Sequence, residues 1–237
     1  MFQRTEVYIT TFNKPKCYFG QTQITFYGYR FDQVGLKPTP EKVQAIHECE
    51  PLGSKTEVRS FLGMTGYLSK FIPRYVSLTK PLRDLTRTET GDLQKTRHLR
   101  KLRALLRART QLHFFNPKLP ILVRVEANYN EGLSAGLFQQ SAKGWPPVHF
   151  IGRSLSDVEK RYSQTEKDAL CVKLAKDWFG MYLQGAPRFT IVTAHKPLLP
   201  VFCKPSVKLP PRIEKWVMDM QDVDFEMKYE PGRDKLD

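Results

Sequence analysis

The 237-residue sequence has few cysteines, few acidic residues for its number of bases, and no long apolar run. Cys17, Cys49, Cys171 and Cys203 are far apart and form no C-x-x-C pair, which argues against a zinc knuckle or a disulfide framework. No apolar segment reaches the length of a membrane-spanning helix, and the first residues lack the apolar core of a secretory signal. We therefore expect an intracellular protein, cytoplasmic or nuclear rather than secreted, with no membrane partner.

The shortage of acids leaves a strongly basic chain. The sequence has 38 Lys and Arg against 24 Asp and Glu, a formal net charge of +14, and a pI near 9.7. A charge of this sign and size favours polyanionic partners, because basic side chains release the counterions condensed on phosphates. Nucleic acid is the leading candidate partner.

The first half of the chain predicts a hairpin followed by short helices. Short β-prone runs separated by glycine-containing turns within residues 1–37 are typical of a hairpin. Helices are then expected over residues 40–49, 54–71 and 92–109, because these segments carry capping residues or apolar side chains at helical spacing. Short helices of this kind make a small bundle.

The periodicity changes after the proline-containing segment 116–120, and we place a domain boundary there. The elements expected beyond it are strands at 121–127, 134–140 and 148–152, a long helix at 164–183, a strand at 189–193, a helix at 212–221 and a strand at 224–229. This order predicts a mixed sheet with helices packed on it, an α/β (α+β) fold.

Several short motifs follow one another in the first third of the chain. They are Asn13-Lys-Pro-Lys-Cys-Tyr-Phe-Gly20, Phe26-Tyr-Gly-Tyr29, Gly35-Leu-Lys-Pro-Thr-Pro-Glu-Lys-Val43, and Arg59-Ser-Phe-Leu-Gly63 followed by Tyr67 and Phe71-Ile-Pro73. In this order and spacing they resemble the Pol polyprotein of Gypsy-class LTR retrotransposons. The resemblance implies the end of a reverse transcriptase palm with its primer-grip hairpin (1–37), a thumb-like helical region (38–115) and an RNase H-like domain (116–237).

By this resemblance, Phe26, Tyr27, Gly28 and Tyr29 form the primer grip, which holds the end of the growing strand. A glycine lets the protein backbone approach a nucleic-acid backbone closely, and the tyrosines can pack on sugars. The alternative is an ordinary hairpin with the glycine at a bulge.

The basic helix of the thumb-like region is the second candidate surface for nucleic acid. Its density of positive charge suits phosphate contacts, and the alternative is a solvated helix face. The candidate residues are Arg97, Arg100, Lys101, Arg103 and Arg107.

The second half of the chain resembles the RNase H domain of the same family at the places where that domain carries metal-binding carboxylates. Glu126 and Glu166 are the catalytic and metal-binding residues that the resemblance implies, with Mg²⁺ or Mn²⁺ as the cofactor. Glu126 is longer than the family's Asp, and Ala194 occupies another Asp position with a methyl group that offers no lone pair to a cation. We therefore expect weakened metal binding and impaired hydrolysis.

Other residues near these positions allow more than one interpretation. Ser163 and Glu166 also fit a capping box, in which Glu166 bonds to the N-cap amide and has no catalytic role. His195 lies at the family's register and is a candidate nucleic-acid contact, although a histidine at a strand end is more often structural. The family's last Asp falls beyond residue 237, so the domain is expected to be truncated, with Asp234 and Asp237 as candidate replacements.

The Tyr-x-Asp-Asp strand of the polymerase site appears nowhere in the sequence, so DNA synthesis by this chain alone is not expected. The resemblance implies a fragment of a reverse transcriptase and ribonuclease H that binds RNA/DNA hybrid or duplex nucleic acid, with the rest of a Pol polyprotein as a further partner. The alternatives are a non-catalytic nucleic-acid-binding or interaction module derived from a retroelement, and a decaying relic.

Overall fold

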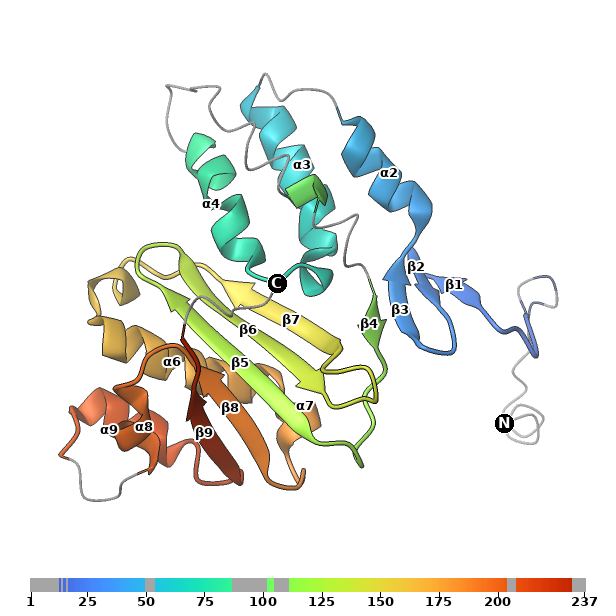
Figure 1. Cartoon of the computed structure of the whole chain (residues 1–237). Coiled ribbons are helices and arrows are strands. Elements are labelled where there is room, and N and C mark those ends of the chain that lie inside the picture. Colours follow the sequence, from blue (N-terminus) through green and yellow to red (C-terminus); the bar gives the residue numbers. More distant parts are fainter. Residues whose placement is uncertain are drawn as a thin grey trace.

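Two β-sheets and the helices around them form the structure, which is a computed structural model (Figure 1). It describes residues 13, 15, 17–49, 54–86, 102–104, 111–203 and 208–231. In this part of the chain, no helix combines the length and the apolar character needed to cross a membrane.

The smaller sheet is antiparallel. Its strands, in spatial order, are β1 (Ile24–Phe26), β2 (Tyr29–Phe31), β3 (Gly35–Pro38) and β4 (Leu112–His113). β1 and β2 form the predicted hairpin, and Tyr27 and Gly28 make its two-residue turn with φ of 46° and 67°. Positive φ at both central residues matches the twist of the flanking strands, so the glycine serves a tight turn and not a bulge. Residues 17–20, in the β-prone run before this hairpin, do not form a strand in the structure.

Two of the predicted helices are confirmed with small changes. They are α2 (Pro40–Glu48) and α3 (Lys55–Tyr67). The Ser54 hydroxyl caps α3 by accepting a hydrogen bond from the Glu57 amide, whereas the Thr39 side chain makes no such bond at the start of α2. α3 ends earlier than expected, because the chain tightens into a 3-10 turn, η2 (Ser69–Phe71), before Pro73.

The next helix, α4 (Tyr75–Leu85), was not predicted. It follows Arg74, whose backbone is left-handed, and it contains Pro81, so the sequence lacks the usual signs of a helix there. Most of the predicted basic helix falls outside the described residues, including Arg97, Arg100, Lys101 and Arg107. Residues 102–104 are helical.

The larger sheet confirms the predicted mixed topology. Its spatial order is β7-β6-β5-β8-β9, formed by β5 (Ile121–Asn128), β6 (Gly132–Gln139), β7 (Pro147–Arg153), β8 (Phe189–Thr193) and β9 (Phe225–Tyr229). β5 pairs with β6, and β6 with β7, in antiparallel register, while β8 is parallel to both β5 and β9.

The helices of this second half differ from the prediction in detail. They are η4 (Glu159–Arg161), α6 (Gln164–Trp178), α7 (Gly180–Leu183), α8 (Leu198–Cys203) and α9 (Pro211–Met218). The single long helix predicted over 164–183 is divided at Phe179, and α8 was not predicted. Asp234 and Asp237 lie outside the described residues.

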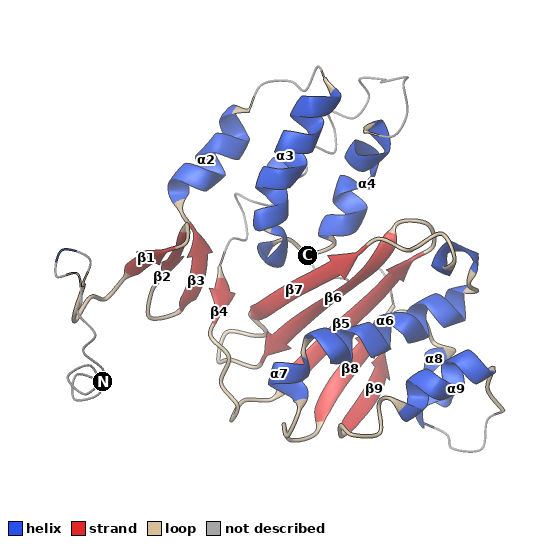
Figure 2. Ribbon diagram, turned by 180° about the vertical axis from the view of Figure 1, so that it is seen from behind, coloured by secondary structure: helices blue, strands red, loops and turns tan. Residues whose placement is uncertain are grey.

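Helices cover both faces of the larger sheet (Figures 1 and 2). Val123 and Val125 of β5 join the core beneath α6, together with Ala169 and Val172 of that helix. The residues at the alternate positions of these strands point to the opposite face of the sheet, toward the helical region. This second core combines Leu122, Phe138, Phe150 and Val192 of the sheet with Phe61, Phe71, Ile72, Leu78 and Leu82 of the helical region. The helical region and the larger sheet therefore share one apolar core.

Candidate functional site

Glu126 and Ala194 lie side by side at one edge of the larger sheet. Val125 of β5 pairs with Thr193 of β8 in parallel register. The residues that follow them, Glu126 and Ala194, therefore lie beside each other. A small depression of about 20 Å³, roughly enough for one water, is lined by both residues and by Arg124 and Glu230. Two of the positions at which the resemblance expects metal-binding carboxylates are therefore neighbours in the structure.

Glu126 is ion-paired with a residue from outside the sheet. Arg74 Nε lies 2.7 Å from Glu126 Oε2, and their side chains are 34% and 19% exposed. This separation is that of an ion pair, although the Arg74 N–H does not point at the carboxylate oxygen in the direction that a hydrogen bond requires. Nothing in the motif pattern indicated this contact, because Arg74 lies before α4 and far from β5 in the sequence.

Glu166 forms the capping box at the start of α6. Its Oε2 accepts hydrogen bonds from the Ser163 amide and the Ser163 hydroxyl, both at 2.9 Å, and its Oε1 accepts one from Arg212 at 2.7 Å. Burial opposes ionisation of Glu166, but the Ser163 hydrogen bonds and the Arg212 guanidinium outweigh it and lower the pKa of the carboxyl. Both oxygens are thus engaged in the cap and the ion pair, which favours the capping alternative over the metal-binding prediction.

Asp168 is the α6 carboxylate that lies toward the end of β5, and the sequence interpretation missed it. It is buried, and its Oδ2 accepts a hydrogen bond at 2.7 Å from Gln164 Nε2. The same Gln164 nitrogen donates to the carbonyl of Ala127, the residue after Glu126, at 3.0 Å. The sequence contained a signal for this role. If Glu166 belongs to the capping box, Asp168 is the next carboxylate of the helix, and it directly precedes the apolar run that starts at Ala169.

His195 connects the end of β8 with the start of α6. Its Nδ1 lies 3.6 Å from Asp168 Oδ2, and its Nε2 lies 3.1 Å from the Thr165 hydroxyl. Its backbone amide donates to Thr193 Oγ1. Because both ring nitrogens face protein groups, the geometry supports the structural reading of His195, and its nucleic-acid contact stays a prediction.

This set of residues does not fit a divalent metal. Within the described ranges, no three His, Cys, Asp or Glu side chains come together in a way that could hold a metal ion. Glu126 is paired with a guanidinium, Glu166 caps a helix, and Ala194 supplies no lone pair. Two-metal hydrolysis needs several oxygen ligands directed at one place. These residues therefore do not supply the ligand set that two-metal hydrolysis requires.

The hairpin turn presents two exposed aromatic rings. Phe26 and Tyr27 are 58% and 79% exposed, and their rings meet edge to face with centroids 4.4 Å apart. The φ of 46° at Tyr27 holds its side chain at the tip of the turn. These two predicted primer-grip residues are accessible to a base or a sugar.

Tyr29, by contrast, belongs to a stack that we call the cation–π stack, formed by Lys42, Tyr67, Tyr29 and Lys70. The two tyrosine rings lie parallel with centroids 4.6 Å apart. Lys42 Nζ lies 3.5 Å from the Tyr67 ring and Lys70 Nζ lies 3.6 Å from the Tyr29 ring, one at each end. Burial raises the pKa of Tyr29 and lowers the pKa of Lys70. The stack therefore attaches the hairpin to α2 and α3.

Gly28 and Arg103 also have roles within the protein. A Cβ atom at Gly28 would come within 2.3 Å of Lys42 Cε, so the glycine makes room for one end of the cation–π stack. Arg103 donates hydrogen bonds to the carbonyls of Ile46 and Cys49, at 3.1 and 2.6 Å, where α2 ends. Arg103 is thus engaged by the end of α2 rather than directed at a phosphate.

Comparison with known proteins confirms the resemblance drawn from the motifs. Residues 116–223 match the RNase H-like domain found in reverse transcriptase. The chain is 33% identical over 225 residues to the retrovirus-related Pol polyprotein from transposon 297 of Drosophila melanogaster, covering 92% of this chain and 20% of that protein. It is 29% identical over 238 residues to the corresponding polyprotein from transposon opus of the same organism, covering 94% of this chain and 23% of that protein. The chain thus spans about a fifth of the length of these curated relatives.

The fold is similar to that of the foamy viral protease-reverse transcriptase. The foamy viral protease-reverse transcriptase in complex with RNA/DNA hybrid superposes with a TM-score of 0.68 at 19% identity, covering 92% of this chain and 30% of that one. At this identity the likeness concerns the fold alone. Residues 116–223 thus carry an RNase H-like domain of the kind found in reverse transcriptase, and the whole chain is similar to the reverse transcriptase and RNase H region of retroelement Pol polyproteins.

Proposed function

We propose that this chain binds RNA/DNA hybrid or duplex nucleic acid and hydrolyses the RNA strand poorly or not at all. The observation that carries the proposal is the ion pair between Glu126 and Arg74 beside Ala194, in a domain whose relatives belong to reverse transcriptases. The net charge of +14 supports the binding half of the proposal, because it favours a polyphosphate partner. The foamy viral enzyme of similar fold was solved with RNA/DNA hybrid, which indicates the class of ligand to test first.

Loss of hydrolysis follows from the chemistry of the donors. Family resemblance implies Mg²⁺ or Mn²⁺, and hard oxygen ligands are what these ions require. At this site one carboxylate already faces a guanidinium and another position is a methyl group. We propose that metal binding is weakened for this reason, and that the chain acts as the binding part of a longer Pol polyprotein.

The hairpin tip is the proposed contact with the nucleic acid. Stacking of a base on an aromatic ring is worth about 1–3 kcal/mol, so the Phe26→Ala, Tyr27→Ala double variant should bind hybrid about 5- to 150-fold more weakly. Trp145→Ala is the matched control, because Trp145 is also an exposed ring, 41% accessible, but lies between β6 and β7. Equal losses in both variants would argue against a specific role for the hairpin.

Activity is tested by incubating the purified chain with labelled RNA/DNA hybrid and Mg²⁺ or Mn²⁺. We expect a shifted complex without cleavage above the background of the buffer. Cleavage at a rate similar to that of an intact RNase H would overturn the proposed loss of hydrolysis. Failure to bind hybrid or duplex at low salt would overturn the proposed binding.

A second candidate function is an interaction module released from catalytic constraint, which the Arg74–Glu126 pair favours. Restoring carboxylates with Glu126→Asp and Ala194→Asp distinguishes a domain that still positions a hybrid for cleavage from an interaction module that does not. Regained cleavage would show that the scaffold still aligns a hybrid. Binding without regained cleavage would favour the interaction module.

A further inference from the structure

Arg74 connects the helical region to the carboxylate of Glu126 in the larger sheet. It is the residue before α4, and its ion pair with Glu126 spans 2.7 Å. Glu126 and Leu122 lie on alternate positions of β5 that share a face, and Leu122 belongs to the core shared with the helical region. The face of the sheet that carries Glu126 is therefore the face that α4 covers.

The backbone at Arg74 is held in an uncommon conformation. Its φ of 53° and ψ of 31° are left-handed, a region that few residues other than glycine, asparagine and aspartate adopt. Such a conformation persists only where the surrounding contacts fix it. At Arg74 it directs the chain from η2 into α4 while the guanidinium lies against Glu126.

Further contacts hold α4 against the same face. A Cβ atom at Gly132 or at Gly152 would lie 2.6 or 2.9 Å from a methyl group of Val76, so these two glycines make room for the helix. Later in α4, Arg83 donates hydrogen bonds to the hydroxyls of Ser154, just beyond β7, and of Thr79. The start and the end of α4 are thus both attached to the sheet.

The charges on this face are balanced by arginines. Arg124, two residues before Glu126 on the same strand, is ion-paired with Glu230 at 2.5 Å. Arg124, Glu126 and Glu230 line the same small depression. Arg74 and Arg124 together match the charge of the two glutamates, so an additional divalent cation would meet positive charge that is already in place.

We propose that the guanidinium of Arg74 has taken the place of a cation at Glu126, and that Glu126 now fastens the helical region to the sheet instead of binding Mg²⁺. This goes beyond the proposed loss of hydrolysis, because it gives the remaining carboxylate a positive role. The expected consequence is a protein whose stability depends on Arg74 and does not depend on Mg²⁺.

The experiment compares the full chain with its Arg74→Asn variant. Asparagine tolerates the left-handed backbone, so this change removes the charge and leaves the turn possible. We expect the melting temperature of the variant to fall by several degrees, and hydrogen exchange in α4 and β7 to become faster. Mg²⁺ should leave the melting temperature of the unmodified chain unchanged relative to EDTA at equal ionic strength.

Arg124→Asn is the matched control. It removes an arginine of an arginine–glutamate pair on the same face, but Arg124 and Glu230 both belong to the sheet side, so exchange in α4 should stay as in the unmodified chain. Glu126→Gln tests the pair from its other partner and keeps the side-chain size, which covers the case in which Arg74→Asn does not fold. It should reproduce the faster exchange in α4.

Manganese binding, followed by the paramagnetic resonance of free Mn²⁺, gives an independent readout without nucleic acid. Stoichiometric Mn²⁺ binding by the unmodified chain that disappears in Glu126→Gln would overturn the proposal, because Glu126 would then be a metal ligand. Unchanged melting and unchanged exchange in both Arg74→Asn and Glu126→Gln would also overturn it. Neither result depends on whether the chain binds hybrid.

Discussion

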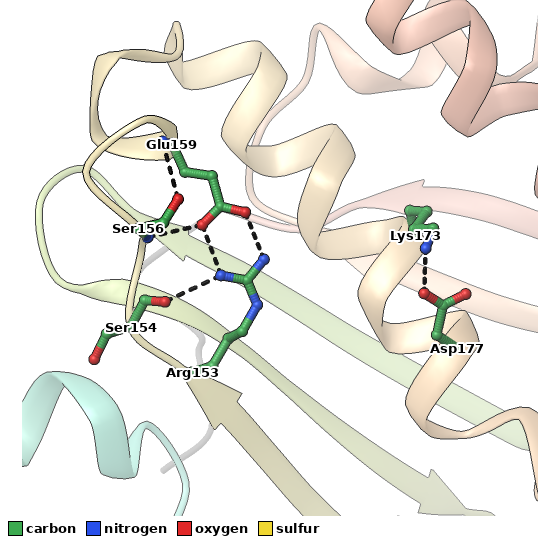
Figure 3. Close-up of polar contacts among 6 residues, drawn as sticks. All are labelled: Arg153, Ser154, Ser156, Glu159, Lys173 and Asp177. Atoms are coloured by element: carbon green, nitrogen blue, oxygen red, sulfur yellow. Dashed lines mark hydrogen bonds and ion pairs between the residues drawn. The ribbon is translucent and has the colours of Figure 1, made fainter.

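Glu159 is a carboxylate held ionised by its immediate neighbours. Both of its oxygens accept hydrogen bonds from the Arg153 guanidinium at 2.7 Å, and the Ser156 amide donates to one of them at 2.8 Å (Figure 3). The hydrogen bonds from Arg153 contribute most to lowering the pKa of Glu159, from 4.5 to about 2. The pair fixes the segment between β7 and α6, which leads to the capping box.

Glu159→Gln should lower the free energy of unfolding at pH 7 by roughly 1–2 kcal/mol, between the values typical of exposed and of buried pairs. A lowered carboxyl pKa stabilises the folded state above pH 4.5, and this contribution is lost as the pH falls from 4.5 toward 2. The stability difference between the two proteins should therefore shrink through this window in urea unfolding. A difference that stays constant down to pH 2 would contradict this account.

Asp177→Asn is the control for that prediction. Asp177 is paired with Lys173 on the surface of α6, one turn apart (Figure 3). A pair of this kind contributes about 0.3–0.5 kcal/mol, so its loss should be several times smaller. Equal losses in both variants would indicate that the two hydrogen bonds between Arg153 and Glu159 stabilise the protein no more than a surface ion pair does.

The carboxylates of α6 show how far residue roles follow from sequence. The spacing of Ser163 and Glu166 predicts the capping box that the structure contains. The position of Asp168 beside His195 depends on how α6 docks against the end of β8, and no local pattern carries that information. The pairing of Glu126 with Arg74 is likewise a contact between distant segments.

At the scale of elements, the strands of the larger sheet were predicted well because their apolar residues alternate or run together between turn residues. α4 was missed because Pro73 and Pro81 mark it as a place where helices end. Its helical state is fixed by packing, since Val76, Leu78 and Leu82 are buried. In this segment, tertiary contacts outweigh the low local helix propensity.

Gly152→Ala should test how closely α4 packs on the sheet. The added methyl would lie 2.9 Å from Val76 Cγ2 and 3.1 Å from the Leu133 carbonyl, so we expect a loss of about 1–3 kcal/mol, as for other overpacked sites. In a Val76→Ala background the same change should cost less, because the shortened side chain leaves room. A double-mutant cycle by chemical unfolding measures this coupling, and additive effects would contradict the proposed contact.

At the scale of the whole molecule, the charge of +14 should dominate the salt dependence of nucleic-acid binding. Each phosphate contact releases counterions, so the affinity for a labelled hybrid should fall at least about tenfold between roughly 50 and 200 mM salt. Fluorescence anisotropy at several salt concentrations gives the slope, and the Phe26→Ala, Tyr27→Ala variant should keep it, because the two rings carry no charge. A salt-independent affinity would argue against phosphate contacts.

The order of motifs predicted the relationship to retroelement polyproteins, and the mixed sheet was predicted from periodicity. The packing of the helical region on that sheet was not, because an apolar stripe on a helix does not say which surface it covers. The sequence predicted a small helical bundle, whereas Phe71 and Leu82 share their core with Phe138 and Phe150 of the sheet.

This shared core has a consequence for biosynthesis. Translation completes α2, α3 and α4 before β5 to β8 are made, and these strands supply the other half of the core. The nascent chain therefore carries an uncovered apolar surface until the last of these strands has left the ribosome. Exposed surface of this kind promotes aggregation during synthesis, which makes this interval the stage at which the chain depends most on chaperones.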